Sequence, residues 1–262
     1  MSILSEIVER KRQRVESAKR TLQFDGLERR SNPHRLRHAL LRDGINIIAE
    51  FKRRSPSKGV IRAGADLKQI VKSYESGGAA ALSVLTEEDY FSGSLEDLRT
   101  AKSTVDLPVL RKDFIVDEYQ VYESAAAGAD AVLLIVAVLD DENLAALRRL
   151  AEDGLGLDAL VEVHTREEMQ RALACGASLI GVNNRNLHDF TVSLDTSLSL
   201  APDAPGTTVL VSESGLHSAA DLSRLHDAGY RGFLIGESLM RSEDPAVTLR
   251  GLRDLRGWRG AS

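Results

Sequence analysis

The segment AAGADAVLLIV, residues 126–136, holds the pattern that decides the fold: alanines at the end of a helical stretch, then a glycine, then an apolar run of strand length. The same order recurs in SGGAAALSVL (76–85), ACGASLIGV (174–182) and DAGYRGFLIG (227–236). The glycines at positions 78, 128, 176 and 229 are expected just past helix ends, because the left-handed conformation there costs glycine little. A recurring unit of helix, glycine and strand predicts a sheet made of repeated β–α modules.

Eight short apolar runs follow one another from residue 45 onward, at 45–51, 80–85, 108–110, 131–136, 159–163, 179–182, 208–211 and 232–235. Near-continuous apolar runs are typical of parallel strands buried on both faces, and an amphipathic segment follows each one. Helix starts are expected at Asp66, Ser94, Asp140, Thr165 and Ser218, with Thr165 and Glu168 forming a capping box. Eight uniform units predict one α/β domain over residues 1–262, a closed (β/α)8 TIM barrel.

Residues 1–44 precede the first strand and are predicted to form an N-terminal helical extension. Ile3, Leu4, Ile7, Val8 and Val15 have helical spacing, and a second short helix is expected around residues 35–41. The basic residues of the first helix are expected to form a solvated face. They are Arg10, Lys11, Arg12 and Arg14.

The composition excludes several classes of protein. With 43% hydrophobic and 28% charged residues, the chain has the profile of a soluble globular protein. A net charge of −5 gives no positive field to hold nucleic acid. The longest apolar run, 131–139, is far shorter than the ~20 residues that span a bilayer, so no membrane insertion is expected. The single cysteine, Cys175, and the charged N-terminus predict a cytoplasmic protein, and no obligate protein partner is evident.

Polar side chains gather where the predicted strands end, the rim that carries the active site in such barrels. The residues at these strand ends are Glu50, Lys52, Lys112, Asp113, Glu162, His164, Asn183, Asn184, Arg185, Glu213, Ser214, Gly236 and Glu237. Side-chain direction alternates along a strand, so Ile48 shares a face with Glu50, and Leu110 with Lys112. The expected lumen is apolar below and polar above. Its ionisable groups are candidates for acid–base chemistry, with structural ion pairs as the alternative.

Two strand ends predict a phosphate site. SESG (212–215) and IGES (235–238) follow the seventh and eighth strands, where many such barrels bind phosphate through backbone N–H groups. After the first strand, RRSPSKG (53–59) is interpreted as a basic lid, with an ordinary solvated loop as the alternative. An aromatic ring could be accepted by Phe91, Phe114, Leu133, Leu187 and Leu234, although such residues are often simply core.

Together these segments resemble the indole-3-glycerol phosphate synthase family. The matching stretches are IAEFKRRSPSKG (48–59), SVLTEEDYFSGS (83–94), PVLRKDFIV (108–116), ALVEVHT (159–165), IGVNNRNL (180–187), VSESG (211–215) and FLIGESLM (233–240). The resemblance implies ring closure of 1-(2-carboxyphenylamino)-1-deoxyribulose 5-phosphate, with loss of carbon dioxide and water, to indole-3-glycerol phosphate. It also implies that neither a metal nor an organic cofactor takes part.

The family's roles fall on matching positions of this chain. Lys112 is implied as general acid toward the ketone oxygen, Glu162 as the other acid–base group, and Lys52 as the group that binds the carboxylate or serves the dehydration. Glu50 and Asn183 are implied to bind substrate hydroxyls, and Glu213 to hold the lysines and substrate in register. The substrate- and phosphate-binding residues implied are Ser55, Ser214, Gly215, Gly236, Glu237 and Arg185. Which lysine protonates which oxygen stays open.

Three other interpretations stay open. A class I aldolase would need a Schiff-base lysine, and after Lys112 the chain has no further lysine. A phosphosugar isomerase of the phosphoribosylanthranilate type resembles this fold but uses a cysteine on the first strand, whereas Cys175 lies at a helix end. A barrel that binds a phosphorylated metabolite without turnover would not need two lysines and two carboxylates in one lumen. His164 is predicted to be structural, with a role as base as the alternative.

Overall fold

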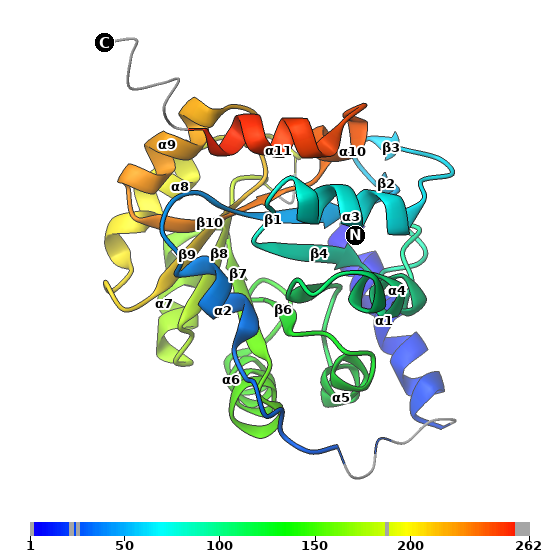
Figure 1. Ribbon diagram of the computed structural model, residues 1–262. Coiled ribbons are helices and arrows are strands. Elements are labelled where there is room, and N and C mark those ends of the chain that lie inside the picture. The colour runs from blue at the N-terminus through cyan, green and yellow to red at the C-terminus, as the bar shows by residue number, and fades with distance from the viewer. Residues whose placement is uncertain (1–2, 21–23, 25–26, 187–188, 255–262) are drawn as a thin grey trace.

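Eight parallel strands close into a barrel in a computed structural model that describes residues 3–20, 24, 27–186 and 189–254 (Figure 1). The barrel strands are β1 (Asn46–Phe51), β4 (Ala81–Leu85), β5 (Val109–Lys112), β6 (Ala131–Ile135), β7 (Asp158–Val163), β8 (Leu179–Asn183), β9 (Val209–Glu213) and β10 (Tyr230–Ile235). β1 pairs with both β4 and β10, which closes the ring. The predicted (β/α)8 barrel is confirmed.

The strands β5 and β9 continue two residues past their predicted ends, to Lys112 and Glu213. A polar side chain that points into the lumen does not interrupt the backbone ladder, so the apolar run alone underestimates these strands. A short hairpin that was not predicted, β2 (Arg54–Ser55) with β3 (Gly59–Val60), lies within the expected lid segment.

Helices surround the strands (Figure 1). They are α3 (Leu67–Ser76), α4 (Leu95–Thr104), α5 (Glu118–Ala126), α6 (Asp141–Arg149), the π-helix η1 (Leu150–Leu155), α7 (Arg166–Ala174), α8 (Asp195–Leu200), the 3-10 turn η2 (Ala201–Asp203), α9 (Ala219–Asp227), α10 (Glu237–Arg241) and α11 (Pro245–Arg253). In the described part of the chain no helix is long and apolar enough to cross a membrane.

The predicted helix boundaries are largely confirmed. The five expected N-cap side chains each accept a backbone N–H, and the four repeat glycines have φ between 84° and 104°. The capping box at Thr165 is wrong in one half, because the Glu168 carboxylate accepts from the backbone of His164 instead. A complete box forms at Ser218 with Asp221.

Two apolar layers hold the barrel. The outer layer lies between strands and helices and includes Phe51, Val84 and Leu134. The inner layer fills the lumen with Ile48, Leu110, Leu160, Val211 and their neighbours. The lumen below the polar rim is therefore apolar, as the alternation along the strands predicts.

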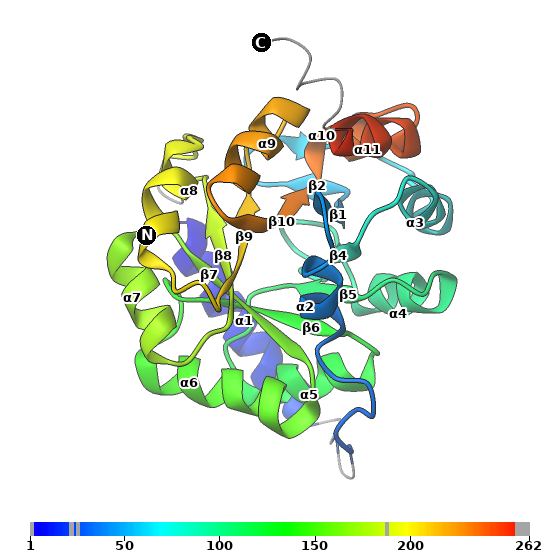
Figure 2. The same cartoon turned by 60° about the vertical axis from the view of Figure 1, so that its left-hand side comes forward.

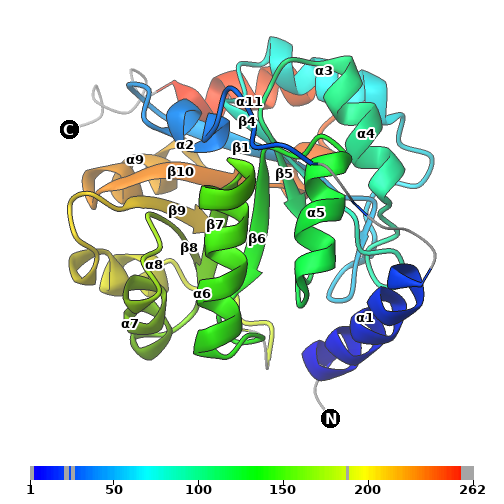
Figure 3. The ribbon, with the colours of Figure 1, turned by 90° about the horizontal axis from the view of Figure 1, so that it is seen from below.

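The N-terminal extension supplies a helix to each end of the barrel (Figures 2 and 3). α2 (Arg35–Leu40) buries Leu36 and Leu40 in the inner layer and lies where the strands begin. α1 (Ile3–Lys19) lies at the opposite end, where the strands terminate, and is in contact with α5. The lumen is thus closed below by α2 and bordered above by α1.

Candidate active site

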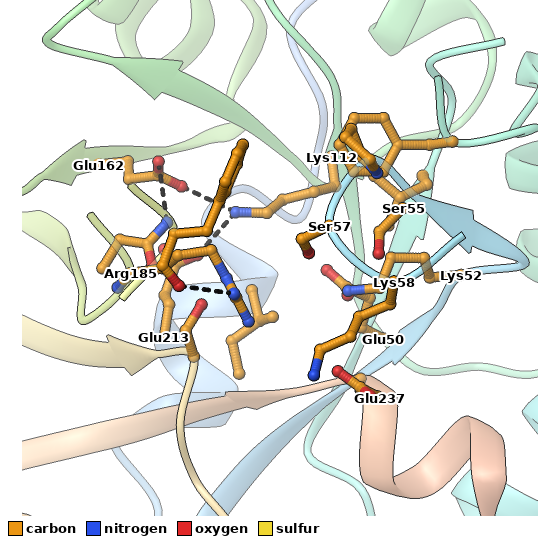
Figure 4. A pocket seen from close by; sticks show the side chains of 18 of the residues that line it. Glu50, Lys52, Ser55, Ser57, Lys58, Lys112, Glu162, Arg185, Glu213 and Glu237 are labelled. Carbon is orange, nitrogen blue, oxygen red and sulfur yellow. Dashed lines mark hydrogen bonds and ion pairs between the residues drawn. The ribbon is translucent and has the colours of Figure 1, made fainter. Parts of the chain in front are cut away.

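A cavity of about 440 Å³ opens at the carboxyl ends of the strands (Figure 4). The predicted site residues on its wall are Glu50, Lys52, Ser55, Phe91, Lys112, Phe114, Leu133, Glu162, Asn183, Arg185, Glu213, Ser214, Gly215, Leu234, Gly236 and Glu237. Leu187, predicted for the same wall, lies outside the described residues. Five different strands contribute the central polar groups, because parallel strands in a closed barrel all end at the same rim.

Lys112, at the end of β5, extends toward two buried carboxylates (Figure 4). Its Nζ lies 2.8 Å from Glu162 Oε2 and 2.6 Å from Glu213 Oε2. Burial lowers the pKa of Lys112, but the negative charges of Glu162, Glu213 and Glu50 outweigh it and raise the pKa above its ordinary value. Lys112 is therefore an ammonium group throughout the neutral range.

The pKa values of the two carboxylates that hold Lys112 are shifted in opposite directions. Burial raises the pKa of both. For Glu162, the charges of Lys112 and His164 and a hydrogen bond from Asn183 Nδ2 at 3.3 Å bring the pKa below its usual range. For Glu213, burial and the nearby negative charge of Glu162 prevail over Lys112, so the pKa rises. One carboxylate is thus fixed in its charged form, and the other takes up a proton more readily.

Glu213 also presents an unused acceptor. Among the described residues, no group donates a hydrogen bond to its buried Oε1. This oxygen occupies the space that a Cβ at Gly181 would need, so glycine at that position on β8 makes room for it. A buried acceptor without a donor costs free energy unless a ligand satisfies it.

A second charged pair faces the first across the cavity. Lys52 Nζ, one residue past β1, lies 2.5 Å from Oε1 of the buried Glu50. Gly236 leaves the space that the Glu50 carboxylate occupies. The Lys52–Glu50 pair therefore lines the same cavity as Lys112, Glu162 and Glu213.

Four of the predicted phosphate-binding residues, Ser214, Gly215, Gly236 and Glu237, lie at the ends of β9 and β10, whereas Ser55 belongs to β2 and Arg185 follows β8. Ser214 and Gly215 both have left-handed backbone, with φ of 67° and 76°, and such strain in a residue other than glycine is typical of binding turns. The Glu237 side chain turns to Arg241, at 3.1 Å. The backbone N–H groups of the turn at Ser214 and Gly215, rather than the Glu237 carboxylate, are therefore the groups suited to bind an anion.

One wall of the cavity is apolar. The rings of Phe91 and Phe114 lie 6.3 Å apart, and Leu133 and Leu234 extend the wall. Three further apolar residues come from α1 and were not predicted here: Ile3, Leu4 and Ile7. Their spacing identified them as a buried helix face, but sequence contains no signal for which surface that face covers.

The lid segment borders the cavity through Pro56, Ser57 and Lys58. The first residue of the segment is held in place, because Arg53 forms two hydrogen bonds with Asp97, at 2.6 and 2.8 Å. The segment predicted as a lid thus combines an anchored start with a hairpin over the cavity.

The expectation of a solvated basic face on α1 is wrong for Lys11. Only 6% of its side chain is exposed, and its Nζ lies 2.8 Å from the buried Asp113 carboxylate. Burial raises the pKa of Asp113, but Lys11 and Arg111 hold it well below its usual range. Arg12 is exposed as expected, and Arg14 pairs with Glu88 and Asp89. Lys11 was missed because its partner lies about a hundred residues away in sequence.

His164 lies next to Glu162, with its ring Nε2 3.4 Å from Glu162 Oε1. Its other ring nitrogen, Nδ1, is 3.2 Å from Glu168 Oε2. Within residues 3–20, 24, 27–186 and 189–254, no group of three or more His, Cys, Asp or Glu side chains is placed to hold a metal ion.

Solved structures with low sequence identity support the fold. A KGPDC from Streptococcus mutans is 16% identical with a TM-score of 0.61, covering 81% of this chain and 97% of that protein. A thiamine phosphate pyrophosphorylase from Pyrococcus furiosus is 18% identical with a TM-score of 0.59, covering 80% of this chain and 94% of that one. At such identities the likeness concerns the barrel alone.

Sequence relatives are much closer. An indole-3-glycerol phosphate synthase from Koribacter versatilis is 51% identical over 239 residues, covering 90% of this chain and 92% of the relative. The enzyme of the same name from Carboxydothermus hydrogenoformans is 46% identical over 261 residues, covering 95% and 98%. The family model described as indole-3-glycerol phosphate synthase matches residues 4–252. This chain belongs to the indole-3-glycerol phosphate synthase family.

Proposed function

We propose that this chain closes the indole ring of 1-(2-carboxyphenylamino)-1-deoxyribulose 5-phosphate, with loss of carbon dioxide and water, to give indole-3-glycerol phosphate. The observation that carries the proposal is Lys112, held as an ammonium between Glu162 and Glu213 on the floor of a cavity with one apolar wall. Family membership supports the same reaction.

Lys112 acts as the general acid in the first step. The aromatic carbon that bears the carboxylate attacks the ketone carbon, and negative charge develops on the ketone oxygen. A fixed ammonium stabilises that charge and then protonates the oxygen, because an alkoxide is a stronger base than an amine. The two carboxylates keep Lys112 charged and limit the directions in which it can donate.

Glu162 acts as the base of the later steps. Dehydration requires a proton to leave the carbon next to the nitrogen, and Glu162 remains ionised in the folded protein. Lys52 binds the substrate carboxylate or assists the departure of water. Glu50 and Asn183 bind the hydroxyl groups, and Glu213 holds Lys112 and the substrate in register.

The remaining wall suits the two ends of this substrate. The phenyl ring fits against Phe91, Phe114, Leu133 and Leu234, together with the apolar residues of α1. The phosphate is assigned to the lining residues Ser55, Ser214, Gly215, Gly236, Glu237 and Arg185.

The other interpretations are less well supported. A Schiff-base lysine must be a neutral amine to attack, whereas the surroundings of Lys112 favour its charged form. Cys175 follows α7 at its C-terminal end, its thiol bonds the carbonyl of Ala172, and burial raises its pKa. It therefore lacks the features of an activated nucleophile.

We propose one domain over residues 1–262, with residues 1–44 as its helical extension, since α2 closes the lumen and α1 borders the cavity. We propose a cytoplasmic enzyme that acts on a free phosphorylated small molecule, without nucleic acid, membrane or an obligate protein partner. The single cysteine, the net charge and the size of the cavity support this view.

The test is the appearance of indole fluorescence when the purified protein is mixed with the carboxyphenylamino-deoxyribulose phosphate, alongside Lys112→Ala. Loss of a positioned acid lowers rates by about 10²–10⁴, so the variant should lose at least two decades of kcat. Circular dichroism and binding of a phosphorylated substrate analogue check that the variant keeps its fold and cavity. Binding without turnover by the parent protein would refute the catalytic proposal and leave a phosphate-binding barrel.

A further inference from the structure

His164 connects the catalytic cluster to a second carboxylate outside it. It follows the end of β7, and its ring lies between Glu162 on β7 and Glu168 in the first turn of α7. Glu168 Oε2 accepts the backbone N–H of His164 at 2.6 Å and also lies 3.2 Å from ring Nδ1. One carboxylate therefore fixes both the backbone and the ring of His164, which aims Nε2 at Glu162.

The ring nitrogen that faces Glu162 is unsatisfied. Nε2 is buried, and in the described part of the chain it has no hydrogen-bond partner. Glu162 Oε1, at 3.4 Å, is within reach of a small rotation of the ring. A buried polar atom without a partner requires an explanation, and a histidine nitrogen directed at a carboxylate is able to exchange a proton with it.

The charges around His164 favour its protonated form. Burial lowers the pKa of the ring, but Glu168, Glu162 and Glu213 together raise it above the usual value. Lys112 on β5 is the positive group of this cluster and is bound by Glu162 and Glu213. These charges therefore favour the imidazolium form of the ring, in which Nε2 carries a proton toward Glu162.

The reaction itself needs such a proton, on the basis of the function proposed above. The ketone oxygen receives two protons and leaves as water, while the carbon next to the nitrogen releases one. The carboxylate leaves as carbon dioxide and takes no proton with it. Each turnover therefore consumes one proton more than the substrate provides.

We propose that His164 supplies this proton to the cavity through Glu162. After Lys112 protonates the ketone oxygen, Nε2–H of the imidazolium passes to Glu162 Oε1, and the Glu162 carboxyl returns a proton to Lys112. The ring is left neutral with its proton on Nδ1, toward Glu168. It regains the Nε2 proton through Glu162, which lines the cavity that water enters when product leaves. His164 is thus a positioning and proton-supplying residue that acts through Glu162.

The experiment measures single-turnover rate, KM and the pH dependence of kcat for wild type and His164→Asn. Asparagine keeps a hydrogen-bond donor but holds no transferable proton, so the rate should fall roughly tenfold with KM unchanged. In wild type, kcat should fall as rising pH removes the imidazolium proton, and the variant should lack this limb. His226→Asn, on α9 away from the cavity, is the matched control and should behave as wild type.

Glu168→Gln gives an independent test should the asparagine variant fold poorly. Glutamine can still accept the backbone N–H of His164 but removes the negative charge beside the ring. The alkaline limb of kcat should therefore move to lower pH, with little change below it. A rate and profile equal to wild type in His164→Asn, or an unmoved limb in Glu168→Gln, would overturn the proposal. Absence of turnover in the wild type would instead refute the proposed function.

Discussion

Buried carboxylates at the two ends of the barrel are satisfied differently. At the end closed by α2, Asp130 precedes β6 and is 2% exposed. One oxygen accepts from Arg30 at 2.7 Å and Arg35 at 3.5 Å, and the other from Lys102 at 2.6 Å and the backbone of Val109 at 2.9 Å. Both oxygens of this carboxylate are occupied.

At the catalytic end, similar burial leaves atoms unoccupied. Glu213 Oε1 and His164 Nε2 are buried without a hydrogen-bond partner among the described residues. An unsatisfied buried polar atom costs roughly 1–3 kcal/mol, which folding must offset elsewhere. The difference between Asp130 and these two groups indicates which of these buried groups hold the barrel together and which stay available to a ligand or a proton.

Asp130→Ala tests the structural end and should have the largest effect on stability. Removing the buried carboxylate leaves the Val109 N–H unpaired, while the basic partners can turn to water. We expect the free energy of unfolding to fall by about 3 kcal/mol, which is at the lower end of the usual range for removing one partner of a buried ion pair. Urea unfolding measures the loss, and kcat and KM should stay at wild-type values.

Asp106→Ala is the matched control, since Asp106 also binds Arg35, at 2.7 Å, but its side chain is 96% exposed. Its stability should equal that of wild type. If Asp130→Ala lowers activity while stability is kept, the division of roles between the two ends is wrong.

Lys11→Met tests a fully paired charge at the catalytic end. It leaves Asp113 buried with Arg111 alone, and we expect a loss of about 2 kcal/mol near neutral pH. The pKa of Asp113 is depressed in the folded protein, so its stabilisation is present above the unfolded pKa, about 3.9, and is lost as pH falls toward the folded pKa. The difference between variant and wild type should therefore shrink between pH 7 and pH 3.

Lys19→Met serves for comparison, because Lys19 pairs with Asp117 at 2.6 Å while both side chains are partly exposed. Its effect should be much smaller at either pH. An equal loss for Lys11→Met at pH 7 and pH 3 would mean that the shape of methionine, rather than charge, destabilises the helix.

The positions of Glu50, Lys112, Glu162 and Glu213 could be predicted from the sequence because they follow from the topology of the barrel. Once eight apolar runs indicate a closed parallel barrel, each strand end must lie at the same rim, whatever its distance along the chain. The apolar residue two positions earlier then fixes the direction of the polar one. Local rules of this kind do not depend on side chains from elsewhere.

The surroundings of α1 could not be predicted in this way. Its apolar spacing predicts a buried face, but the cavity wall that it completes, and the Asp113 that Lys11 binds, belong to the barrel. The Glu168 carboxylate likewise binds one residue earlier than a capping box requires, because His164 offers it both a backbone and a ring N–H. Contacts between distant segments decided the first two outcomes, and a contact between residues four positions apart decided the third.

Gly232 on β10 and Gly236, just past the end of that strand, allow the two ends of the barrel to be compared. A Cβ on Gly232 would lie 2.9 Å from Val211 Cγ2 and 3.2 Å from Leu40 Cδ1, in the apolar lumen. A Cβ on Gly236, just past the strand, would overlap Glu50 Oε1 and lie 3.0 Å from its Cδ. The same added methyl group would therefore contact apolar core side chains at one end and the Glu50 carboxylate at the other.

Gly232→Ala should lower the free energy of unfolding by about 1 kcal/mol through overpacking and leave kcat/KM unchanged. Gly236→Ala should displace the Glu50 carboxylate from Lys52 and lower kcat/KM roughly tenfold, since a misplaced catalytic group costs rate rather than stability. Urea unfolding and steady-state kinetics on both variants separate the outcomes. Equal losses of activity would mean that the lumen transmits strain from one end to the other, and the two ends could then no longer be treated as independent.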